Sequence, residues 1–503
     1  GGGHCYLLLP NTSSVEQMLA QWNRRFNDWL LSEFGTRLYL ADGWTPCSAQ
    51  SLSNQPTEDA PYEAIFRRAS EAVSEKKLRR YTPTQLRTLN KMPASDGARE
   101  CRICGSHSRL TESADGVTLC PWCATFERIS RKIQTCDLIF VEEDTENADF
   151  TLPILHGSVG FRFKEKSSVG EKPARSYLRC YAKNHYPNGL HSCIRIFVGD
   201  YAAETQLEKL AQASDGIARI AVCRMDVDDL GQSFVGGFRH IHSGTLALTA
   251  AFSRQLSRFF KCDINALLSG EAEGKTALQV AVVYSGGDDV FLVGAWTDVL
   301  TAAQRIRAAF RRYTCGTLSI SGGIALFDAR YPIRLAAEKT AELEDEAKHL
   351  PRKNGISLFT ANGRHVYPWD IYETKVLGEK VALLERFFSS ESQERGNAFL
   401  YRMLALLRES DEQKGKGIAI ARLAYLLARM EPKRDAPAWE LYGAFSRKIY
   451  AWALLPQERR ELITAIYIFA YRNRKVRDAD AESLRKTNAS GAAQGGEASG
   501  GLH

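Results

Sequence analysis

The stretch that most constrains the fold of this chain is residues 279–295, QVAVVYSGGDDVFLVGA. Two apolar runs rich in Val, Phe and Leu flank the tetrapeptide Gly286-Gly287-Asp288-Asp289. Such runs predict two β-strands, and the tetrapeptide predicts the tight turn of a hairpin between them. Gly and Asp are also good turn residues for conformational reasons alone, so the turn by itself leaves open whether its two carboxylates have a function.

The hairpin lies within an alternating unit of helices and strands at residues 214–365. Apolar residues at helical spacing, such as Leu246, Leu256 and Phe260, predict helices, and short apolar runs predict strands. The expected order is a strand in 216–231, a helix over 245–261, the hairpin, a helix over 297–314, a strand over 317–327, a helix over 332–350 and a strand over 355–360. This alternation predicts an α/β domain.

The beginning of the chain repeats part of this unit. GGGHCYLLLP (1–10) aligns with GGDDVFLVGA (286–295), and Gly3 and His4 stand at the positions of the two acids. The elements expected to follow are a helix over 15–34, a strand over 37–44 and a helix over 62–80. The sequence therefore predicts two copies of one fold, of which the first lacks its opening strand, its first helices and the acids.

The pattern changes between the two copies and again after the second. Residues 93–213 contain a Cys-rich segment and short strand-like runs. After residue 365, apolar residues recur at helical spacing with few strand signals, which predicts a helical domain over 366–478. The end of the chain, residues 479–503, is rich in Gly, Ala and Ser and is expected to be disordered.

Acidic residues follow the first predicted strand of the second copy. In RMDVDDLGQ, Asp226 ends the strand, and Asp228 and Asp229 follow it. If the hairpin pairs beside this strand, Asp226 and Asp288 converge at one end of the sheet, where carboxylates are costly unless a cation joins them. Oxygen ligands favour Mg²⁺, or Mn²⁺, so Asp226, Asp288 and Asp289 are predicted to be catalytic metal ligands for two-metal nucleotidyl transfer. Asp228 is instead predicted to be the N-cap of the next helix.

A nucleoside triphosphate also needs donors for its phosphates. Backbone N–H groups around 228–231, where a helix should begin, could cradle phosphates, and the predicted nucleotide-binding residues here include Val227 and Gly231. Lys348 and Lys353, at the end of the last helix of the unit, could neutralise the β and γ phosphates. Each of these lysines, taken alone, is equally well explained as a solvated surface charge.

Four cysteines have the spacing of a metal site. Cys101-x₂-Cys104 and Cys120-x₂-Cys123 are separated by fifteen residues in CRICGSHSRLTESADGVTLCPWC. Four thiolates complete a closed tetrahedral shell, so this spacing predicts a structural Zn²⁺ site rather than a catalytic one. The remaining cysteines, and His107, are interpreted as core or surface residues.

Composition narrows the class of protein only a little. The chain has 503 residues, 25% of them charged, and a net charge of +7 that permits contact with nucleic acid without requiring it. No apolar run approaches the length of a membrane span, and the first residues do not resemble a signal peptide. Twelve cysteines are too sparse for a disulfide scaffold, which favours the reducing cytoplasm as the location.

Taken together, these residues resemble the large signature subunit of type III-A (Csm-type) CRISPR–Cas effector complexes. The resemblance runs from residue 1 to about 475 and follows the order of parts in that family. It implies an α/β (α+β) multidomain chain with two ferredoxin-like palm domains. The pieces that carry it are RMDVDDLG, YSGGDDVFLVG, SISGGIALF, EAKHLPRKN, the CxxC pair and IARLAYLLARMEP. The implied domains are a partial, degenerate first palm (1–92), a zinc-binding and β linker domain (93–213), an active second palm (214–365), a helical domain (366–478) and a tail (479–503).

The resemblance also implies an activity. On capture of a matching target RNA, the second palm would join ATP molecules into cyclic oligoadenylates. In the family each palm holds one ATP, the acids matching Asp226, Asp288 and Asp289 hold the metals, and Ser285 lies where the family contacts the base. Gly286 and Gly287 belong to the same nucleotide-binding turn. The implied partners are a CRISPR RNA, the target RNA, a helical small subunit and a guide-end-binding subunit of the Csm type.

In one respect the chain departs from the family pattern. Family members usually begin with an HD-type nuclease domain and a complete first palm, and no His-Asp dipeptide occurs in this sequence. The family's cleavage of single-stranded DNA is therefore not carried over to these residues. A separate chain that supplies the absent region is one explanation among several.

Two other interpretations of the sequence remain open. The chain could be a scaffold without catalysis, whose palms and zinc domain hold RNA and partner subunits. It could also be a stand-alone nucleotide cyclase, although the degenerate first copy and the helical end count against this. The presence of Asp226, Asp288, Asp289 and Lys348 together favours the enzyme.

Overall fold

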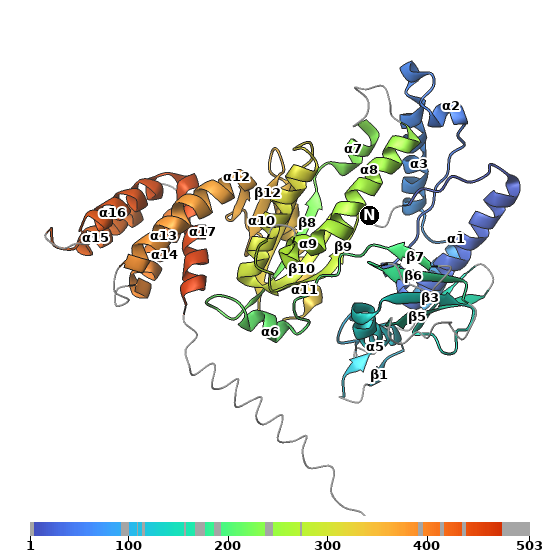
Figure 1. Ribbon diagram of the computed structural model, residues 1–503, viewed down its shortest axis with the longest axis horizontal. Coiled ribbons are helices and arrows are strands. Elements are labelled where there is room, and N and C mark those ends of the chain that lie inside the picture. The colour runs from blue at the N-terminus through green and yellow to red at the C-terminus, as the bar shows by residue number, and fades with distance from the viewer. Residues whose placement is uncertain are drawn as a thin grey trace, which may run out of the picture. The chain divides into compact units, whose positions relative to one another are not determined.

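The structure is a computed structural model in which twelve segments of the chain are described. It divides into two compact units, and Figure 1 labels the elements of both. The first comprises residues 1–200, 229–266 and 285–289, and the second comprises residues 201–228, 267–284 and 290–503. The described segments are 5–91, 100–107, 109–112, 116–154, 157–165, 177–185, 193–236, 245–271, 274–390, 396–412, 417–434 and 439–474. Gly3, His4 and the predicted tail at 479–503 lie outside these segments.

The second unit is built on a sheet of six strands in the order β13-β12-β11-β8-β10-β9. Strand β11 pairs antiparallel with β8 and parallel with β12. Nearly every side chain of β8 is buried, because α10 and α11 both pack against it. The elements are α6 (Leu207–Gln212), β8 (Ile220–Val227), β9 (Val280–Ser285), β10 (Asp289–Ala295), α10 (Trp296–Tyr313), β11 (Ile320–Phe327), α11 (Ile333–Lys348), β12 (Gly355–Leu358) and β13 (Val366–Pro368).

Apart from the helix over 245–261, the strands and helices predicted for residues 214–365 are confirmed to within a few residues. Helix α10 forms where predicted because Val299, Ile306 and Phe310 lie on one buried face. The predicted hairpin also forms: the N–H of Gly286 donates to the carbonyl of Asp289 over 2.9 Å. The helix predicted over 245–261 is instead interrupted, because a π-helical turn follows α8. The elements in this region are α8 (Leu246–Arg258), η5 (Phe259–Asp263) and α9 (Ile264–Ser269).

One glycine of β11 sets how closely α11 lies on the sheet. A Cβ atom on Gly323 would stand 2.4 Å from the backbone nitrogen of Glu344 and 2.6 Å from the Cβ of Leu343. Gly323 pairs with Arg224 in the register of β11 and β8. The bare Cα therefore allows the last turns of α11 to approach the end of β8 that carries the predicted catalytic acid.

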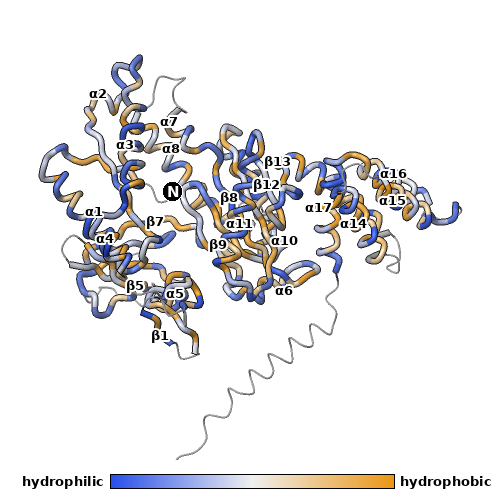
Figure 2. The backbone as a smooth tube through the Cα atoms, turned by 180° about the vertical axis from the view of Figure 1, so that it is seen from behind, coloured by the Kyte–Doolittle hydropathy of each residue, from blue (hydrophilic) through white to orange (hydrophobic). Residues whose placement is uncertain are grey.

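The C-terminal part of the second unit is helical, as predicted. Figure 2 shows hydrophobic residues along these helices, and Phe387 stacks on Phe445 with ring centroids 3.9 Å apart. Lys380 is fully buried and bonded to Glu458 at 2.5 Å and Glu461 at 2.7 Å. The elements are α12 (Trp369–Ile371), the π-helix η7 (Tyr372–Val381), α13 (Ala382–Ser390), α14 (Gly396–Glu412), α15 (Ile418–Arg429), α16 (Trp439–Leu454) and α17 (Pro456–Asn473).

The first unit begins with helices. The predicted strand over 37–44 is wrong for the described residues: the backbone there is not assigned to a strand. Instead the side chain of Asn27 pairs with Leu40, accepting from its N–H at 2.8 Å and donating to its carbonyl at 3.0 Å. The amide side chain thus satisfies both backbone groups that a neighbouring strand would satisfy. The elements are α1 (Ser13–Phe34), η1 (Gly35–Arg37), α2 (Ala49–Leu52), η2 (Thr57–Asp59), α3 (Pro61–Leu78) and α4 (Pro83–Lys91).

The rest of the first unit contains a five-stranded sheet in the order β4-β5-β3-β6-β7. Helix α5 precedes this sheet, and a two-stranded ribbon of β1 and β2 precedes α5. The elements are β1 (Thr111–Glu112), β2 (Thr118–Leu119), α5 (Pro121–Thr135), β3 (Leu138–Glu142), β4 (Phe150–Pro153), β5 (Ser158–Lys164), β6 (Arg179–Lys183) and β7 (Cys193–Ile196), with α7 (Leu230–Gly236) and most of α8 to α9 grouped with this unit.

Candidate functional site

Asp226 lies in an ionic cluster at the end of β8. Its carboxylate accepts a hydrogen bond from Nζ of Lys348, the last residue of α11, and the same ammonium donates to Glu344 over 2.8 Å. Glu344 also pairs with Arg224 at 3.2 Å. The predicted proximity of Lys348 to the acid-bearing strand is thereby present in the structure.

These contacts stabilise the protonated form of Lys348. Burial by itself would lower the pKa of its ammonium, but the hydrogen bonds that the ammonium donates to Asp226 and Glu344 raise this pKa above its usual value. Lys348 is therefore a cation at neutral pH, held by two carboxylates. Glu344 was not predicted from the sequence, although its position four residues before Lys348 on a helix is the spacing of an ion pair.

The predicted role of Asp228 is wrong. Its buried carboxylate does not cap α7: Oδ2 accepts from the hydroxyl of Ser319 at 2.6 Å and from the backbone N–H of Asn354 at 3.0 Å. Its own N–H donates to the carbonyl of Ser319 at 2.9 Å. Asp228 therefore ties the residues after β8 to the start of β11 and to the loop before β12. Its partners are 91 and 126 residues away along the chain, which no local pattern could reveal.

The hairpin turn carries the other two predicted acids. Asp288 and Asp289 are half-buried at the turn, and no donor among the described residues reaches the buried Oδ1 of Asp288. A buried carboxylate oxygen with no donor fits a ligand for a hard cation such as Mg²⁺. Strand β10, which begins at Asp289, is the sheet neighbour of β8.

Ser285 ends β9 and is fixed by the chain around it. Its hydroxyl donates to the carbonyl of Phe260 in η5, and a Cβ atom on Gly199 would stand 2.7 Å from the Cβ of Ser285. The π-helical turn thus places a backbone carbonyl at the end of the hairpin strand. This interaction orients the side chain for which a contact with a base is predicted.

The remaining predicted nucleotide-binding residues differ in their location and in their exposure to solvent. Val227 is buried at the end of β8, opposite Ile320 in the strand register. Gly231 is exposed in α7, with open space where a Cβ atom would lie. Gly286 and Gly287 are buried in the turn. Lys353 lines a cavity beside β11, in the loop that follows α11.

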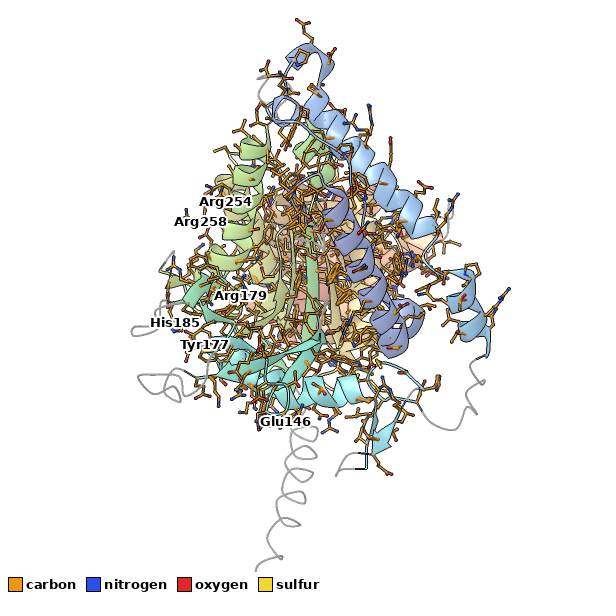
Figure 3. All side chains as sticks on the ribbon, turned by 90° about the vertical axis from the view of Figure 1, so that its right-hand side faces the viewer. Glu146, Tyr177, Arg179, His185, Arg254 and Arg258 are labelled. Atoms are coloured by element: carbon orange, nitrogen blue, oxygen red, sulfur yellow. The ribbon has the colours of Figure 1, made fainter. Side chains whose placement is uncertain are left out.

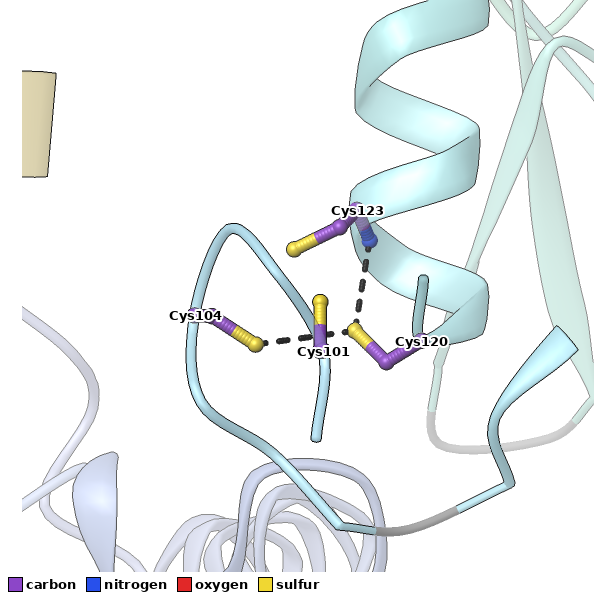
Figure 4. Close-up of side chains that lie close together, drawn as sticks. All are labelled: Cys101, Cys104, Cys120 and Cys123. Atoms are coloured by element: carbon purple, nitrogen blue, oxygen red, sulfur yellow. Dashed lines mark hydrogen bonds between the residues drawn. The ribbon is translucent and has the colours of Figure 1, made fainter. Parts of the chain in front are cut away.

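The four predicted zinc ligands come together in the first unit. The sulfur atoms of Cys101, Cys104, Cys120 and Cys123 all lie within 4.8 Å of one another, and Figure 4 shows them facing a common centre. Cys120 is the N-cap of α5 and accepts from the N–H of Cys123 at 3.4 Å. This four-thiol cluster could hold a metal ion, and His107 is not a member of it.

Backbone donors shape the electrostatics of the thiol cluster. Burial opposes ionisation of Cys101, but the N–H groups of Cys104, Cys120 and Ile103 lower the pKa of its thiol to about 6. Burial raises the pKa of Cys123, and the three neighbouring thiols add to this effect. A cation would reverse the second effect, because it favours the thiolate at every sulfur.

Basic side chains are exposed on the first unit. Figure 3 labels Arg254 and Arg258 on α8, where they are four residues apart, and Arg179 and His185 at the two ends of the β6 region. Arg179, Arg254 and Arg258 are exposed to solvent. Separately, no helix in the described segments combines the length and the apolar character needed to cross a bilayer.

Three family models match the chain. Residues 219–357 match the second palm domain of Cas10/Cmr2, and residues 1–92 match domain B of the Csm1 subunit. Residues 385–475 match the second helical domain of Cmr2, a subunit of the CRISPR RNA silencing complex. The sheet, its helices and the helical C-terminal region thus define a CRISPR protein of the palm-domain class.

Curated relatives make the assignment more specific. The chain is 37% identical over 498 residues to a protein of Mycobacterium tuberculosis and 35% identical over 488 residues to one of Streptococcus thermophilus. Both carry the name CRISPR system single-strand-specific deoxyribonuclease Cas10/Csm1, subtype III-A. The chain belongs to the Cas10/Csm1 family of subtype III-A. Each match covers 94% of this chain and 60% of the relative, so the chain spans about three fifths of the relatives' length.

Solved structures share the fold. A Csm1–Csm4 cassette in complex with one ATP has a TM-score of 0.67 at 21% identity, covering 92% of this chain and 61% of that chain. A Csm1–Csm4 cassette in complex with cA4 has a TM-score of 0.60 at 22% identity, covering 89% of this chain and 60% of that one. The expected multidomain α/β fold with palm domains and a helical C-terminal region is confirmed.

Proposed function

We propose that this chain is the large subunit of a type III-A RNA-guided complex and converts ATP to cyclic oligoadenylates when the complex binds target RNA. The observation that carries the proposal is the arrangement of Asp226 and Lys348 at the end of β8, with the Gly-Gly-Asp-Asp turn on the neighbouring strand β10. Relatives of the same fold have been solved with ATP and with cA4, which supports the substrate and the product class.

The residues of the second palm have distinct roles in this proposal. Asp226, Asp288 and Asp289 would hold Mg²⁺, which when bound activates the attacking 3′-hydroxyl of one ATP and neutralises the departing pyrophosphate of the other. The ammonium of Lys348 can release its hydrogen bond to Asp226 and donate to a nucleotide phosphate instead, while it keeps its hydrogen bond to Glu344. Ser285, Gly286 and Gly287 form the wall against which the base is placed.

Val227, the last residue of β8, and Gly231, in α7, complete the proposed nucleotide site. Their contribution is the backbone of the residues that follow β8, which Asp228 holds to Ser319 and Asn354. Because the Asp228 carboxylate is buried, we expect these bonds to hold the backbone after Asp226 in one conformation as substrate exchanges. We keep Lys353 as a phosphate ligand, contributed by the loop that Asp228 also anchors.

Assembly and location follow from the same proposal. The partners are the CRISPR RNA, the target RNA and other Csm subunits, consistent with relatives solved as Csm1–Csm4 subcomplexes. The setting is cytoplasmic, and the domain boundaries are those given by the sequence. The deoxyribonuclease activity in the names of the curated relatives is not proposed for these residues, since the chain corresponds to only 60% of those proteins.

A scaffold function is the second candidate, and the exposed arginines of the first unit favour it. Arg179, Arg254 and Arg258 offer positive charge that a nucleic-acid backbone would neutralise whether or not ATP is converted. The assembled complex, incubated with ATP, Mg²⁺ and target RNA, separates the candidates. Oligoadenylates detected by mass support the enzyme, and their absence from a complex that binds target RNA supports the scaffold.

Lys348 provides a second test of the enzyme. The Lys348→Met variant removes the ammonium and should raise the KM for ATP by about tenfold to a hundredfold, the range for a charged hydrogen bond to a phosphate. Lys339→Met is a matched control, because Lys339 is on the same helix and faces the ring of Tyr331. Steady-state kinetics on the assembled complex should leave the control unchanged. An unchanged KM for ATP in Lys348→Met would show that Lys348 does not bind the nucleotide.

Zinc is the metal we propose for the four-thiol cluster. Protein purified without chelator should contain one Zn²⁺ per chain, because four thiolates form a closed tetrahedral shell. Elemental analysis should find this zinc lost in Cys120→Ser and retained in Cys47→Ser, whose thiol is exposed and outside the cluster. Metal-free wild-type protein, or zinc retained in full by Cys120→Ser, would contradict the assignment.

A further inference from the structure

The second unit contains a small cavity that is lined by the connection between β12 and β13 and by two helices of the C-terminal domain, α14 and α17. Its volume is about 210 Å³, below the ~300 Å³ at which sites for drug-sized ligands begin, so a ligand there has to be small. All its lining residues belong to one unit. None of the residues proposed above to bind ATP or a metal is among them.

Arginines outnumber acids in the lining of this cavity. Arg364, Arg408 and Arg460 line it, and Asp411 is the one carboxylate among the described lining residues. The nearly buried carboxylate of Asp411 is already paired, because it lies 3.3 Å from Nε of Arg460. Arg364 is bonded at 3.0 Å to Glu412, which does not line the cavity. The lining therefore has an excess of positive charge.

Arg408 is the arginine that lacks an acidic partner. Asp411 and Glu412 follow it on α14 at the helical spacings that permit ion pairs, yet each is bonded to another arginine. In the described segments the guanidinium of Arg408 makes no hydrogen bond or ion pair, and its side chain is exposed. A bound anion would supply the opposite charge that α14 does not.

His365 brings a buried polar group to the cavity wall. The residue is 7% exposed, and its Nδ1 lies 2.7 Å from the hydroxyl of Thr464. This hydroxyl can donate to Nδ1, which leaves the imidazole proton on Nε2, and Nε2 has no hydrogen-bond partner in the described part of the chain. Burial lowers the pKa of His365 to about 4, and the charges of Arg364 and Arg408 add to this effect. The imidazole is therefore neutral at pH 7 and can offer one N–H to a ligand.

We propose that this cavity binds a small oxyanion, a phosphate or a carboxylate group, through Arg408, Arg364 and the Nε2–H of His365. A guanidinium donates two parallel N–H bonds to the oxygens of such a group, and these charge-assisted bonds are stronger than neutral ones. The rings of Phe359 and Tyr467, with centroids 5.9 Å apart, line the same cavity and shield the bound group from water.

Binding at this place joins two parts of the second unit. Arg364 and His365 precede β13, which is an edge strand of the six-stranded sheet, whereas Arg408 belongs to α14 of the helical domain. An oxyanion held from both sides adds a bridge to the pair of Arg364 and Glu412. Because only the folded chain has the cavity, the anion should also raise the melting temperature. Neither effect depends on the conversion of ATP.

Calorimetric titration of the full chain with inorganic phosphate and, separately, with malonate tests the site, in buffer without divalent metal. The anion that binds more tightly identifies the preferred head group. Arg408→Ala should weaken binding of that anion by about tenfold, the value of one hydrogen bond to a charged group. Arg402→Ala is the matched control, because Arg402 is exposed on the same helix and does not line the cavity. Its affinity should equal that of the wild type.

His365→Asn tests the imidazole separately from the arginines. Asparagine can keep a bond to Thr464 but has no donor at the position of Nε2, so binding should again weaken by about tenfold. Thermal unfolding with the anion should show a higher melting temperature for the wild type and for Arg402→Ala, and a smaller rise for Arg408→Ala. Equal affinity of Arg408→Ala and the wild type would overturn the proposal even if His365→Asn fails to fold. The absence of binding of both anions would overturn it as well.

Discussion

Replacing Asp288 and Asp289 by Ala is expected to lower oligoadenylate synthesis by the assembled complex by several orders of magnitude. The change removes two of the three proposed metal ligands, and with them the activation of the attacking hydroxyl. The strands should remain intact, because β9 and β10 are paired by backbone bonds and the change alters only the first side chain of β10. Stability should hold or rise, since Oδ1 of Asp288 is buried without a donor in the described structure.

The control for this variant is Asp328→Ala. Asp328 follows β11, where it pairs with Arg219, which precedes β8. This pair lies at the opposite end of those strands from the Asp226 cluster. Its loss should leave both synthesis and target-RNA affinity unchanged. Oligoadenylate yield and RNA affinity are measured side by side for all three proteins. Equal yields from the double variant and the wild type would end the metal-site proposal, whereas a loss of RNA affinity would favour the scaffold.

Lys380→Ala should destabilise the helical domain by about 3–5 kcal/mol, the usual cost of leaving a buried charge without its partner. Lys380 is fully buried, its ammonium bonds Glu458 and Glu461, and it lies 4.7 Å from the ring centroid of Trp452. Its removal leaves two carboxylates close together, of which that of Glu461 is almost entirely shielded from water. Thermal unfolding followed by circular dichroism should show a lower melting temperature.

Lys375→Ala is the matched control for the buried lysine. Lys375 is on the same π-helix η7 and bonds Glu379 at 2.6 Å, but both side chains are 41% exposed. Exposed pairs contribute about 0–1 kcal/mol, so this variant should melt close to the wild type. A triple variant, Lys380→Met with Glu458→Gln and Glu461→Gln, should recover part of the loss. Equal destabilisation by Lys375→Ala and Lys380→Ala would show that burial of the ion pair does not determine the loss of stability.

Local patterns predicted the elements of the second palm well. Helices α10 and α11 have long apolar stripes, and the run before Asp226 is apolar apart from Arg219 and Arg224, so the pattern of apolar residues identifies their type. The segment 37–44 was predicted to be a strand on similar grounds, yet the backbone N–H and carbonyl of Leu40 pair with the side chain of Asn27 in α1. Whether a segment forms a strand depends on a neighbouring strand with which it can pair. The sequence of the segment itself does not specify that neighbour.

The sequence sufficed to propose ligands for the candidate site, whereas the residues that hold those side chains in place could not be predicted from it. Metal-type spacing identified the four thiols, and the turn identified Asp288 and Asp289. Glu344, Ser319 and the buried carboxylate of Asp228 act through contacts between distant parts of the chain. The contacts of Glu344 depend on the close approach of α11 at Gly323, which is a property of packing rather than of local sequence.

The π-helix η7 makes this domain sensitive to the loss of a single residue. Its i→i+5 hydrogen bonds hold more residues in each turn than an α-helix does. A one-residue deletion before Lys380 would turn that side chain by about 100° about the helix axis, the rotation per residue in an α-helix, and carry it away from Glu458 and Glu461. A gap at residues 372–379 in an alignment with a related protein is therefore not a neutral difference in length. It marks a protein whose buried charges must be arranged in another way.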